Sequence, residues 1–268
     1  MRRKRRALAL TEQEIFGQLG KPVESETLFL WRYPREQVWQ WLGEAGIVGR
    51  LAELGYHRPS LSLRMEGGVH RLKVEEVGEV APLIDLRLTE ESQVGLLAEK
   101  LPRDTLAFLV IQWLSLQDVR GAFTAARPQL PGQDYPGLGV GRKLLSLLTR
   151  VAGELGKDGL VGYPQYYHNA VFYSDFFILV DAHQQGIFLA LRRDLGKLKL
   201  VEASRAVADR RIVETRSGER LLWRPGEMIF PLTGRLKAYY GGREYRTEAE
   251  RASARVAFHL AEQAPASP

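Results

Sequence analysis

The stretch PGLGVGRKLL, from Pro136 to Leu145, places three glycines at alternate positions directly before an apolar run with helical spacing. Glycine allows left-handed backbone conformations and lets a ligand approach bare main-chain N–H groups. Apolar residues recur at helical spacing from Leu144 to Leu155, and Gly156 can end that helix. The stretch therefore predicts a flexible bend at the start of a helix over 142–155. Such a bend is either a tight structural turn or a place for a phosphate group.

Two common phosphate-binding motifs do not fit these residues. A dinucleotide-binding fingerprint needs G-x-G-x-x-G directly after a strand, whereas the glycines here are spaced G-x-G-x-G and follow QLPGQDYP. A P-loop ends in Gly-Lys-Ser or Gly-Lys-Thr, whereas Gly141 is followed by Arg142 and Lys143.

Upstream, apolar patterns predict a series of short elements. Leu28–Tyr33 is expected to be a strand, and two short helices should follow between Pro34 and Leu54. Alternation on both sides of a glycine-containing bend predicts a hairpin over Leu61–Val74. Leu83–Leu88 is expected to be a strand, and Thr89 is expected to cap a helix that ends near Lys100.

Thr105–Leu116 is continuously apolar and rich in β-branched and aromatic residues, which predicts a central strand buried on both faces. After the helix at 142–155, we expect a short strand over Leu160–Tyr163 and a short helix over Tyr166–Tyr173. Segments 176–181 and 187–191 are expected to form a hairpin around Gln-Gln-Gly.

Beyond about Leu200 the pattern changes. Arg211–Trp223 predicts another hairpin. Thr247 and Glu250 have the spacing of a capping box, which would open a final helix that ends near Glu262. This C-terminal material is too apolar to be a loose tail, so we expect it to pack on the core or to form a dimer contact.

PGLGVGRKLL resembles the acyl-CoA-binding loop of the GNAT superfamily of N-acetyltransferases. Gly139 and Gly141 occupy the two small-residue positions of that family's motif. The resemblance implies that backbone N–H groups and the positive end of the helix bind the CoA pyrophosphate, with Arg142 adding a charge contact. The residues that it assigns to acyl-CoA binding in this loop are Gly137, Leu138, Gly139, Val140, Gly141 and Arg142.

The resemblance continues through HNAVFYSDFF and covers about 105–195. It implies that Asn169 contributes to the cofactor site and that Tyr173 protonates the departing CoA thiolate. Asp118, which follows the long apolar strand, is the expected general base. Pro136 stands where the family has Arg or Gln. The spacing after Tyr173 also differs from the family pattern, so Phe172 is an alternative occupant of the tyrosine position.

The expected fold class is therefore α/β, with a GNAT-like mixed sheet flanked by helices. We divide the chain into a basic tail with a short helix (1–20), an N-terminal α/β elaboration (21–104), an acyl-CoA-binding core (105–200) and a C-terminal extension with a hairpin and a final helix (201–268). The expected activity is transfer of an acetyl or related acyl group from acetyl-CoA or another acyl-CoA to a small-molecule or protein amine. The alternative is a non-catalytic binding or interaction protein of the same fold.

Composition limits the other classes of function. The 268-residue chain has a net charge of +6, no cysteine, and no apolar run long enough to cross a bilayer. No long apolar segment follows the basic start MRRKRRALAL, so we expect a cytoplasmic protein rather than a secreted one. The basic tail either holds RNA or DNA electrostatically or is simply solvated. The spacing of His168 and His183 matches no helical zinc site, and we expect no metal.

Overall fold

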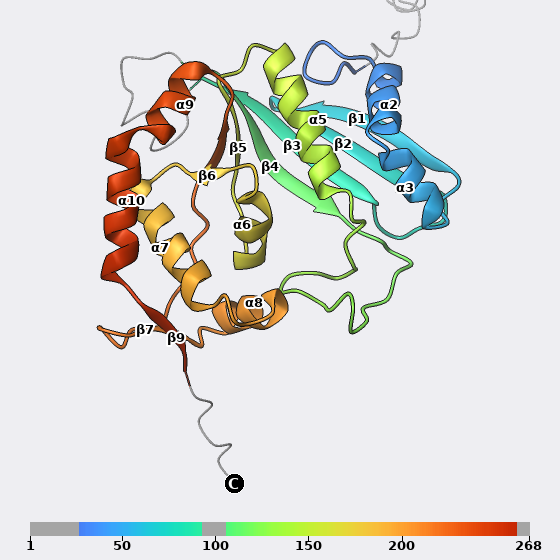
Figure 1. The fold of residues 1–268 in the computed structure, drawn as a ribbon. Helices are drawn as coiled ribbons and strands as arrows, with labels where there is room; N and C mark the ends of the chain where they lie inside the picture. The colour runs from blue at the N-terminus through green and yellow to red at the C-terminus, as the bar shows by residue number, and fades with distance from the viewer. Residues whose placement is uncertain (1–26, 93–105, 262–268) are drawn as a thin grey trace, which may run out of the picture.

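The computed structural model describes residues 27–92 and 106–261, which form a seven-stranded mixed sheet flanked by helices, as expected for an α/β chain (Figure 1). The helices are α2 (Arg35–Glu44), α3 (Ile47–Glu53), α5 (Gly141–Glu154), α6 (Tyr167–Tyr173), α7 (Ala182–Asp194), α8 (Leu200–Ala208), α9 (Gly234–Gly241) and α10 (Arg243–Arg255). The strands are β1 (Pro59–Glu66), β2 (Val69–Glu76), β3 (Ile84–Glu91), β4 (Phe108–Leu116), β5 (Gly159–Gly162), β6 (Ile178–Leu179), β7 (Ile212–Glu214), β8 (Met228–Pro231) and β9 (Phe258–Leu260). The basic tail and short helix expected within 1–20 lie outside the described residues.

The sheet runs in the order β1-β2-β3-β4-β5-β8-β6, and β7 pairs with β9 in a separate small sheet. Strands β1 to β4 are antiparallel neighbours, whereas β4 and β5 are parallel. Two parallel neighbours need a crossover, and α5 supplies it. Strand β8 lies antiparallel between β5 and β6, so residues after 200 contribute to the main sheet itself.

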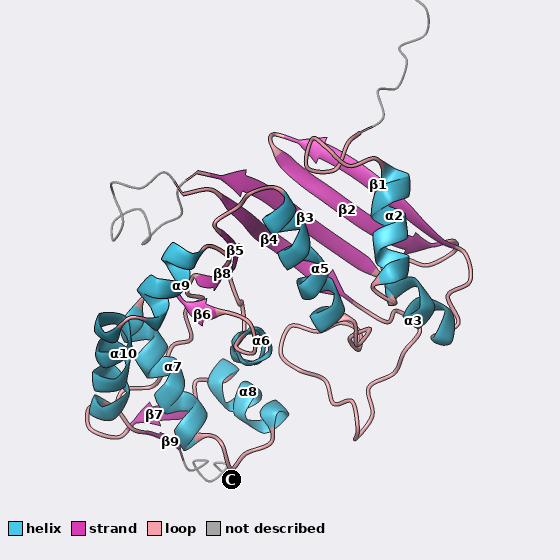
Figure 2. Cartoon of the chain, turned by 45° about the horizontal axis from the view of Figure 1, so that its top comes forward, coloured by secondary structure: helices cyan, strands magenta, loops and turns pink. Residues whose placement is uncertain are grey.

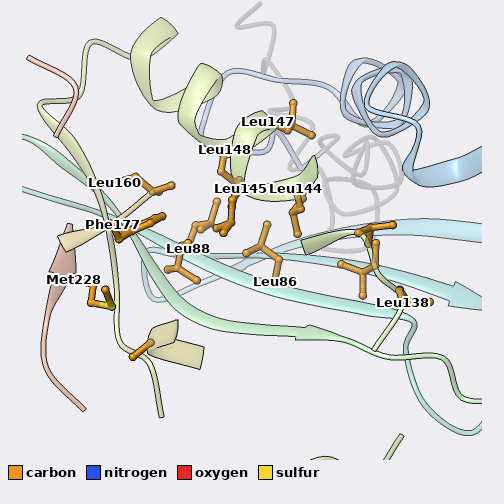
Figure 3. Close-up of a cluster of buried hydrophobic side chains, with 14 of the residues drawn as sticks. Leu86, Leu88, Leu138, Leu144, Leu145, Leu147, Leu148, Leu160, Phe177 and Met228 are labelled. Carbon is orange, nitrogen blue, oxygen red and sulfur yellow. The ribbon is translucent and has the colours of Figure 1, made fainter. Parts of the chain in front are cut away.

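Helices α2, α3 and α5 lie over one face of β1 to β4, while α7, α9 and α10 gather around β8 and β6 (Figure 2). Leu144, Leu145 and Leu148 of α5 point toward Leu86 and Leu88 of β3 in the main core (Figure 3). This contact explains the leucine-rich face of α5, because each leucine removed from water contributes roughly 1.5–3 kcal/mol.

Strand β4 is central, and it separates two apolar clusters. Leu109 and Ile111 belong to the cluster that contains the α5 leucines, whereas Phe108 and Val110 belong to the cluster under α9. The two sides of the sheet are accordingly called the α5 face and the α9 face. The predicted two-sided burial is confirmed for 108–111 only, because Gln112 and Trp113 are exposed and the last three residues of the strand are half-buried.

Several local predictions are confirmed. Pro34 precedes α2, and α3 follows as a second short helix. The β1–β2 hairpin turns at Gly67 and Gly68, which both have positive φ, a conformation that favours glycine. Gly156, also with positive φ, follows the end of α5.

Two N-terminal predictions are wrong. Thr89 does not cap a helix, because β3 continues through it and pairs Thr89 with Val110; the rest of the predicted helix, 93–100, lies outside the described residues. Leu28–Tyr33 is a turn closed by a single bridge between Phe29 and Tyr33 rather than a strand. Leu30 and Trp31 have positive φ there, which extended pairing does not allow.

The hairpin expected over 176–181 and 187–191 is also wrong. Strand β6 is only Ile178–Leu179, and Gln-Gln-Gly lies inside helix α7. Asp181 is the N-cap of that helix, and its carboxylate accepts a hydrogen bond from the Gln184 N–H at 2.8 Å. The cap at Asp181, followed by packing of α7 on α10, outweighs the turn preference of the glycine.

In the C-terminal segment, the predicted capping box is wrong. Helix α10 begins at Arg243, so Thr247 lies inside it, and the helix ends at Arg255 rather than near Glu262. The hairpin expected over Arg211–Trp223 forms in part. A bridge joins Val213 to Arg220, and backbone hydrogen bonds run from the Glu214 N–H to the Glu219 carbonyl and from the Leu221 N–H to the Ile212 carbonyl. Strand β7 also pairs with β9.

Among the described residues, no helix combines the length and the apolar character that crossing a bilayer requires.

Helices α7 and α10 approach closely enough to require glycine at position 186. A Cβ on Gly186 would lie 2.4 Å from the Ala249 carbonyl oxygen and 2.5 Å from the Ala252 Cβ. We expect Gly186→Ala to lower the free energy of unfolding by roughly 1–3 kcal/mol, because backbone atoms must move. Gly153→Ala in α5 is the control. Its Cβ meets nothing within 4 Å, so it should stabilise by about 1 kcal/mol. Urea denaturation compares the two, and equal stability of both variants would contradict the close approach.

Candidate functional site

Strands β4 and β5 pair over a short distance and then separate. Phe108 to Ile111 pair with Gly159 to Gly162, and the described residues offer no further β5-side partner to the backbone of Gln112–Ser115. The register of β3 against β4 shifts at the same level, which leaves Gln112 as an extra residue in β4. Such a bulge bends a strand and increases its local twist. We call the point after Ile111 and Gly162 the fork.

Beyond the fork, β4 pairs with the segment that precedes α5. The N–H of Asp118 donates to the Pro136 carbonyl at 2.7 Å, and the N–H of Leu138 donates to the Leu116 carbonyl at 3.3 Å. Leu138 and Val140 are fully buried, so the apolar residues between the glycines anchor the segment in the core. The glycines of Gly137–Gly141, the glycine segment, are thereby held along the edge of β4.

The N-terminus of α5 leaves several backbone donors available. No side chain caps this helix end. Within the part of the chain that the structure describes, nothing accepts a hydrogen bond from the N–H groups of residues 139–143. Gly139 has φ +76°, and a Cβ there would meet nothing within 4 Å. Free N–H groups at the positive end of a helix are a physical basis for binding an anion.

Asp118 contacts the start of the glycine segment through Arg127. It is only 4% exposed, and its carboxylate accepts a hydrogen bond from the Tyr56 hydroxyl at 2.8 Å and contacts the Arg127 guanidinium at 3.4 Å. Arg127 also donates to the Gly137 carbonyl at 2.7 Å. Burial raises the pKa of Tyr56 to about 12, which keeps this hydroxyl protonated. These contacts favour a structural role for Asp118 over that of a general base.

Tyr173 lies at the fork on the α5 face. Its ring stacks on Phe177 with centroids 5.5 Å apart, and a Cβ on Gly162 would lie 3.4 Å from it. Phe172 points elsewhere and is 50% exposed. Of the two candidates for the tyrosine position, Tyr173 is therefore the one that faces β5. Burial raises the pKa of Tyr173 to about 12.

Of the other predicted site residues, Arg142 connects the start of α5 to the segment after Tyr173, whereas Asn169 contacts its own helix. Arg142 forms an ion pair with Asp175, which follows α6, so this contact joins the start of α5 to the segment after Tyr173. Asn169 caps α6, because its side-chain oxygen accepts the N–H of Tyr166 at 3.2 Å. No contact of Asn169 with the glycine segment is found within the described residues.

Sequence reasoning missed Tyr56, Arg127 and Asp175. Tyr56 is 62 residues from Asp118, and no motif marks the pair. Arg127 lies in the long loop between β4 and the glycine segment. Through its contacts to Asp118 and Gly137, this loop fastens the glycine segment to the end of β4.

Helix α6, which carries Tyr173, is tied to α8 by a buried histidine. The Nδ1 of His168 lies 2.8 Å from the Ser204 hydroxyl, and burial lowers the pKa of His168 to about 4. The unfolded chain has an ordinary histidine pKa near 6.5. Below that value the unfolded state binds the proton more readily than the folded state does.

His168 therefore contributes stability that is fully present above about pH 6.5 and is lost as the pH falls toward 4, by about 3 kcal/mol at pH 4. We expect His168→Gln to reduce the loss of stability between pH 7 and pH 4, measured by urea denaturation at each pH. His183→Gln is the control, because His183 is exposed on α7. Identical pH dependence of His168→Gln and wild type would contradict this assignment.

Comparison with known proteins gives no family for the chain. No protein-family model matches it, and no curated protein sequence matches it. Among the described residues, no three side chains of the metal-binding types converge on one point.

Proposed function

We propose that this protein is an acyl-CoA-dependent N-acyltransferase of the GNAT type. One observation carries the proposal: the fork and the glycine segment lie along the same edge of β4. Beyond Ile111 that edge leaves β5, and at Leu116 it meets the glycine segment. The intervening residues Gln112–Ser115 span roughly 13 Å at about 3.3 Å per residue.

An acyl-CoA has the chemistry to occupy this edge. Its pyrophosphate is an anion suited to the free N–H groups at the start of α5. Its pantetheine arm is extended and carries amide groups. These can pair, as a strand would, with the edge of Gln112–Ser115 that faces away from β3, where the described residues supply no partner. The thioester then reaches the fork, where a backbone N–H of the bulged β4 can polarise its carbonyl.

Tyr173 acts in this proposal as a hydrogen-bond donor to the thioester sulfur. Its raised pKa keeps it protonated at neutral pH. The same shift disfavours complete proton transfer to an ordinary thiolate of pKa near 8.5, by about 5 kcal/mol. A hydrogen bond that strengthens as negative charge develops on sulfur has no such cost.

Two features favour the second candidate, a binding protein that holds an acyl-CoA without transferring the acyl group. Pro136 supplies no side-chain contact where the family has Arg or Gln. The Arg142 guanidinium is already paired with Asp175. Turnover distinguishes the two candidates, since both predict acyl-CoA binding.

The glycine segment provides the test of the binding site. We expect Gly139→Val to weaken acetyl-CoA binding at least about tenfold, because the new side chain fills the open space where the pyrophosphate would lie. Isothermal titration calorimetry with acetyl-CoA measures this. Gly156→Val is the matched control: Gly156 has φ +66° at the other end of α5 and also meets nothing within 4 Å. Equal affinity of the two variants would contradict the assignment.

Tyr173→Phe tests the chemistry. The ring remains, so stacking on Phe177 should survive, and acetyl-CoA affinity should change little. Loss of one hydrogen bond to a charged sulfur, about 1.5–3 kcal/mol, should lower kcat roughly 10- to 100-fold. Phe172→Leu is the control, because its side chain is exposed and should not affect kcat. Full activity of Tyr173→Phe would assign the role to another group.

A further inference from the structure

Residues 192–224, which run from the end of α7 through α8 and β7, form a strongly basic segment. They include ten lysines and arginines but only five aspartates and glutamates, in a chain whose net charge is +6 overall. Of these ten cations, Arg193 alone forms an ion pair within the residues that the structure describes. Figure 1 shows α8, β7 and β9 together at one end of the molecule. The basic segment therefore concentrates unpaired positive charge at that end.

Strand pairing places two arginines and a histidine of this end on one face. Arg211 and Val213 are two residues apart, so they project to the same side of the strand. Val213 is bridged to Arg220 and paired with His259 of β9, so Arg220 and His259 share that side. Both of these side chains are exposed. Ile212, on the opposite side, is fully buried in the main core, so the face that carries the cations points to solvent.

Arg210 adds a third guanidinium at the end of α8, in a backbone conformation that favours glycine. It is exposed and has φ +54°. Its N–H donates to the Val207 carbonyl at 3.1 Å, and the Arg211 N–H donates to the Ala206 carbonyl at 2.8 Å. Glycine is usual at this place in such a helix ending, because a Cβ strains a left-handed residue. A strained arginine where glycine would be more stable indicates that its side chain has a use.

We propose that this surface binds the phosphodiester backbone of a nucleic acid duplex, with Arg210, Arg211 and Arg220 as its central contacts. The Arg220 guanidinium donates to the Arg210 carbonyl at 3.2 Å, which holds these arginines close together. Arginine presents a planar set of donors that matches the oxygens of a phosphate in pairs. Cations that displace the counterions of a phosphate chain give affinity without reading base sequence. The inference goes beyond the proposed function and does not depend on it.

The same surface fits a duplex better than a single strand or a membrane. Single-strand binding relies on aromatic side chains that stack on bases. The exposed large hydrophobic side chains beside these arginines are Leu222 and Leu260, and neither is aromatic. A membrane surface needs an apolar face beside the cations, whereas Ala206 and Val207 of α8 are buried in the main core. The regular row of phosphates along a duplex needs neither feature.

The test measures binding of the full chain to fluorescein-labelled duplexes of mixed sequence, one DNA and one RNA, by fluorescence anisotropy at several salt concentrations. We expect wild type to bind both, with an affinity that falls steeply as salt increases. Arg220→Gln should weaken binding about five- to tenfold at low salt and reduce the slope of log affinity against log salt by about 1. Arg64→Gln is the matched control, because it removes an exposed arginine of β1, at the other end of the molecule. Its affinity should stay within about twofold of wild type.

Arg210→Gly separates a binding role from a structural one. Glycine relieves the strain at φ +54°, while Arg211 and Arg220 keep positive charge at the end of α8, so the melting temperature should rise. Duplex affinity should nevertheless fall about five- to tenfold. A residue retained only for the fold would give the opposite pattern, with a lower melting temperature and unchanged binding.

Three results would overturn the inference. One is that neither duplex binds at low salt. Another is that Arg210→Gly and Arg220→Gln both bind a duplex as wild type does, which would assign the binding to the basic tail instead. The third is that these variants lose binding to vesicles of phosphatidylglycerol and phosphatidylcholine but keep their affinity for both duplexes, which would make the surface a membrane contact. Because the readout is duplex binding, failure of the acyl-CoA proposal leaves each result interpretable.

Discussion

The short parallel pairing of β4 with β5 is the constraint on which the candidate site depends. Three local features limit it to four residue pairs. The bulge at Gln112 bends β4 away, Gly162 ends β5 without a side chain on the α5 face, and Pro164 cannot donate a ladder hydrogen bond. If the pairing were longer, β5 would form hydrogen bonds with the backbone groups of Gln112–Ser115, and these groups would no longer be available to an extended ligand.

A second constraint holds the glycine segment against that edge. Glycines lower the cost of the open conformation but add conformational entropy to the free chain, so other groups must fix the segment. The side chains of Leu138 and Val140 fix the segment by packing in the core, and the Arg127 guanidinium fixes it by a hydrogen bond to the Gly137 carbonyl. Asp118 balances the arginine charge, and Tyr56 supplies the carboxylate with a further donor, which burial of a charge requires.

The sequence predicts the elements whose signal is local and strong. The leucines of α5 and the apolar run of β4 carry the correct periods, and Gly67-Gly68 marks the β1–β2 turn. Local signals fail where tertiary contacts compete with them. Thr89 followed by two glutamates is a sound helix start, yet pairing with β4 keeps it in a strand. Gly186 suggests a turn, yet it lies inside helix α7, at a position where α10 leaves no room for a side chain.

The site shows the same division. The glycine segment was predicted because its glycines lie at alternate positions within five residues, whereas Tyr173 and Phe172 stayed alternatives until the fold showed which ring faces β5. Arg127 was not predicted, because its place depends on chain segments that meet only in the fold. In the same way, Glu227 meets Tyr163 because β8 enters the sheet between β5 and β6, although 64 residues separate the two. Strand order is a non-local property that periodicity does not encode.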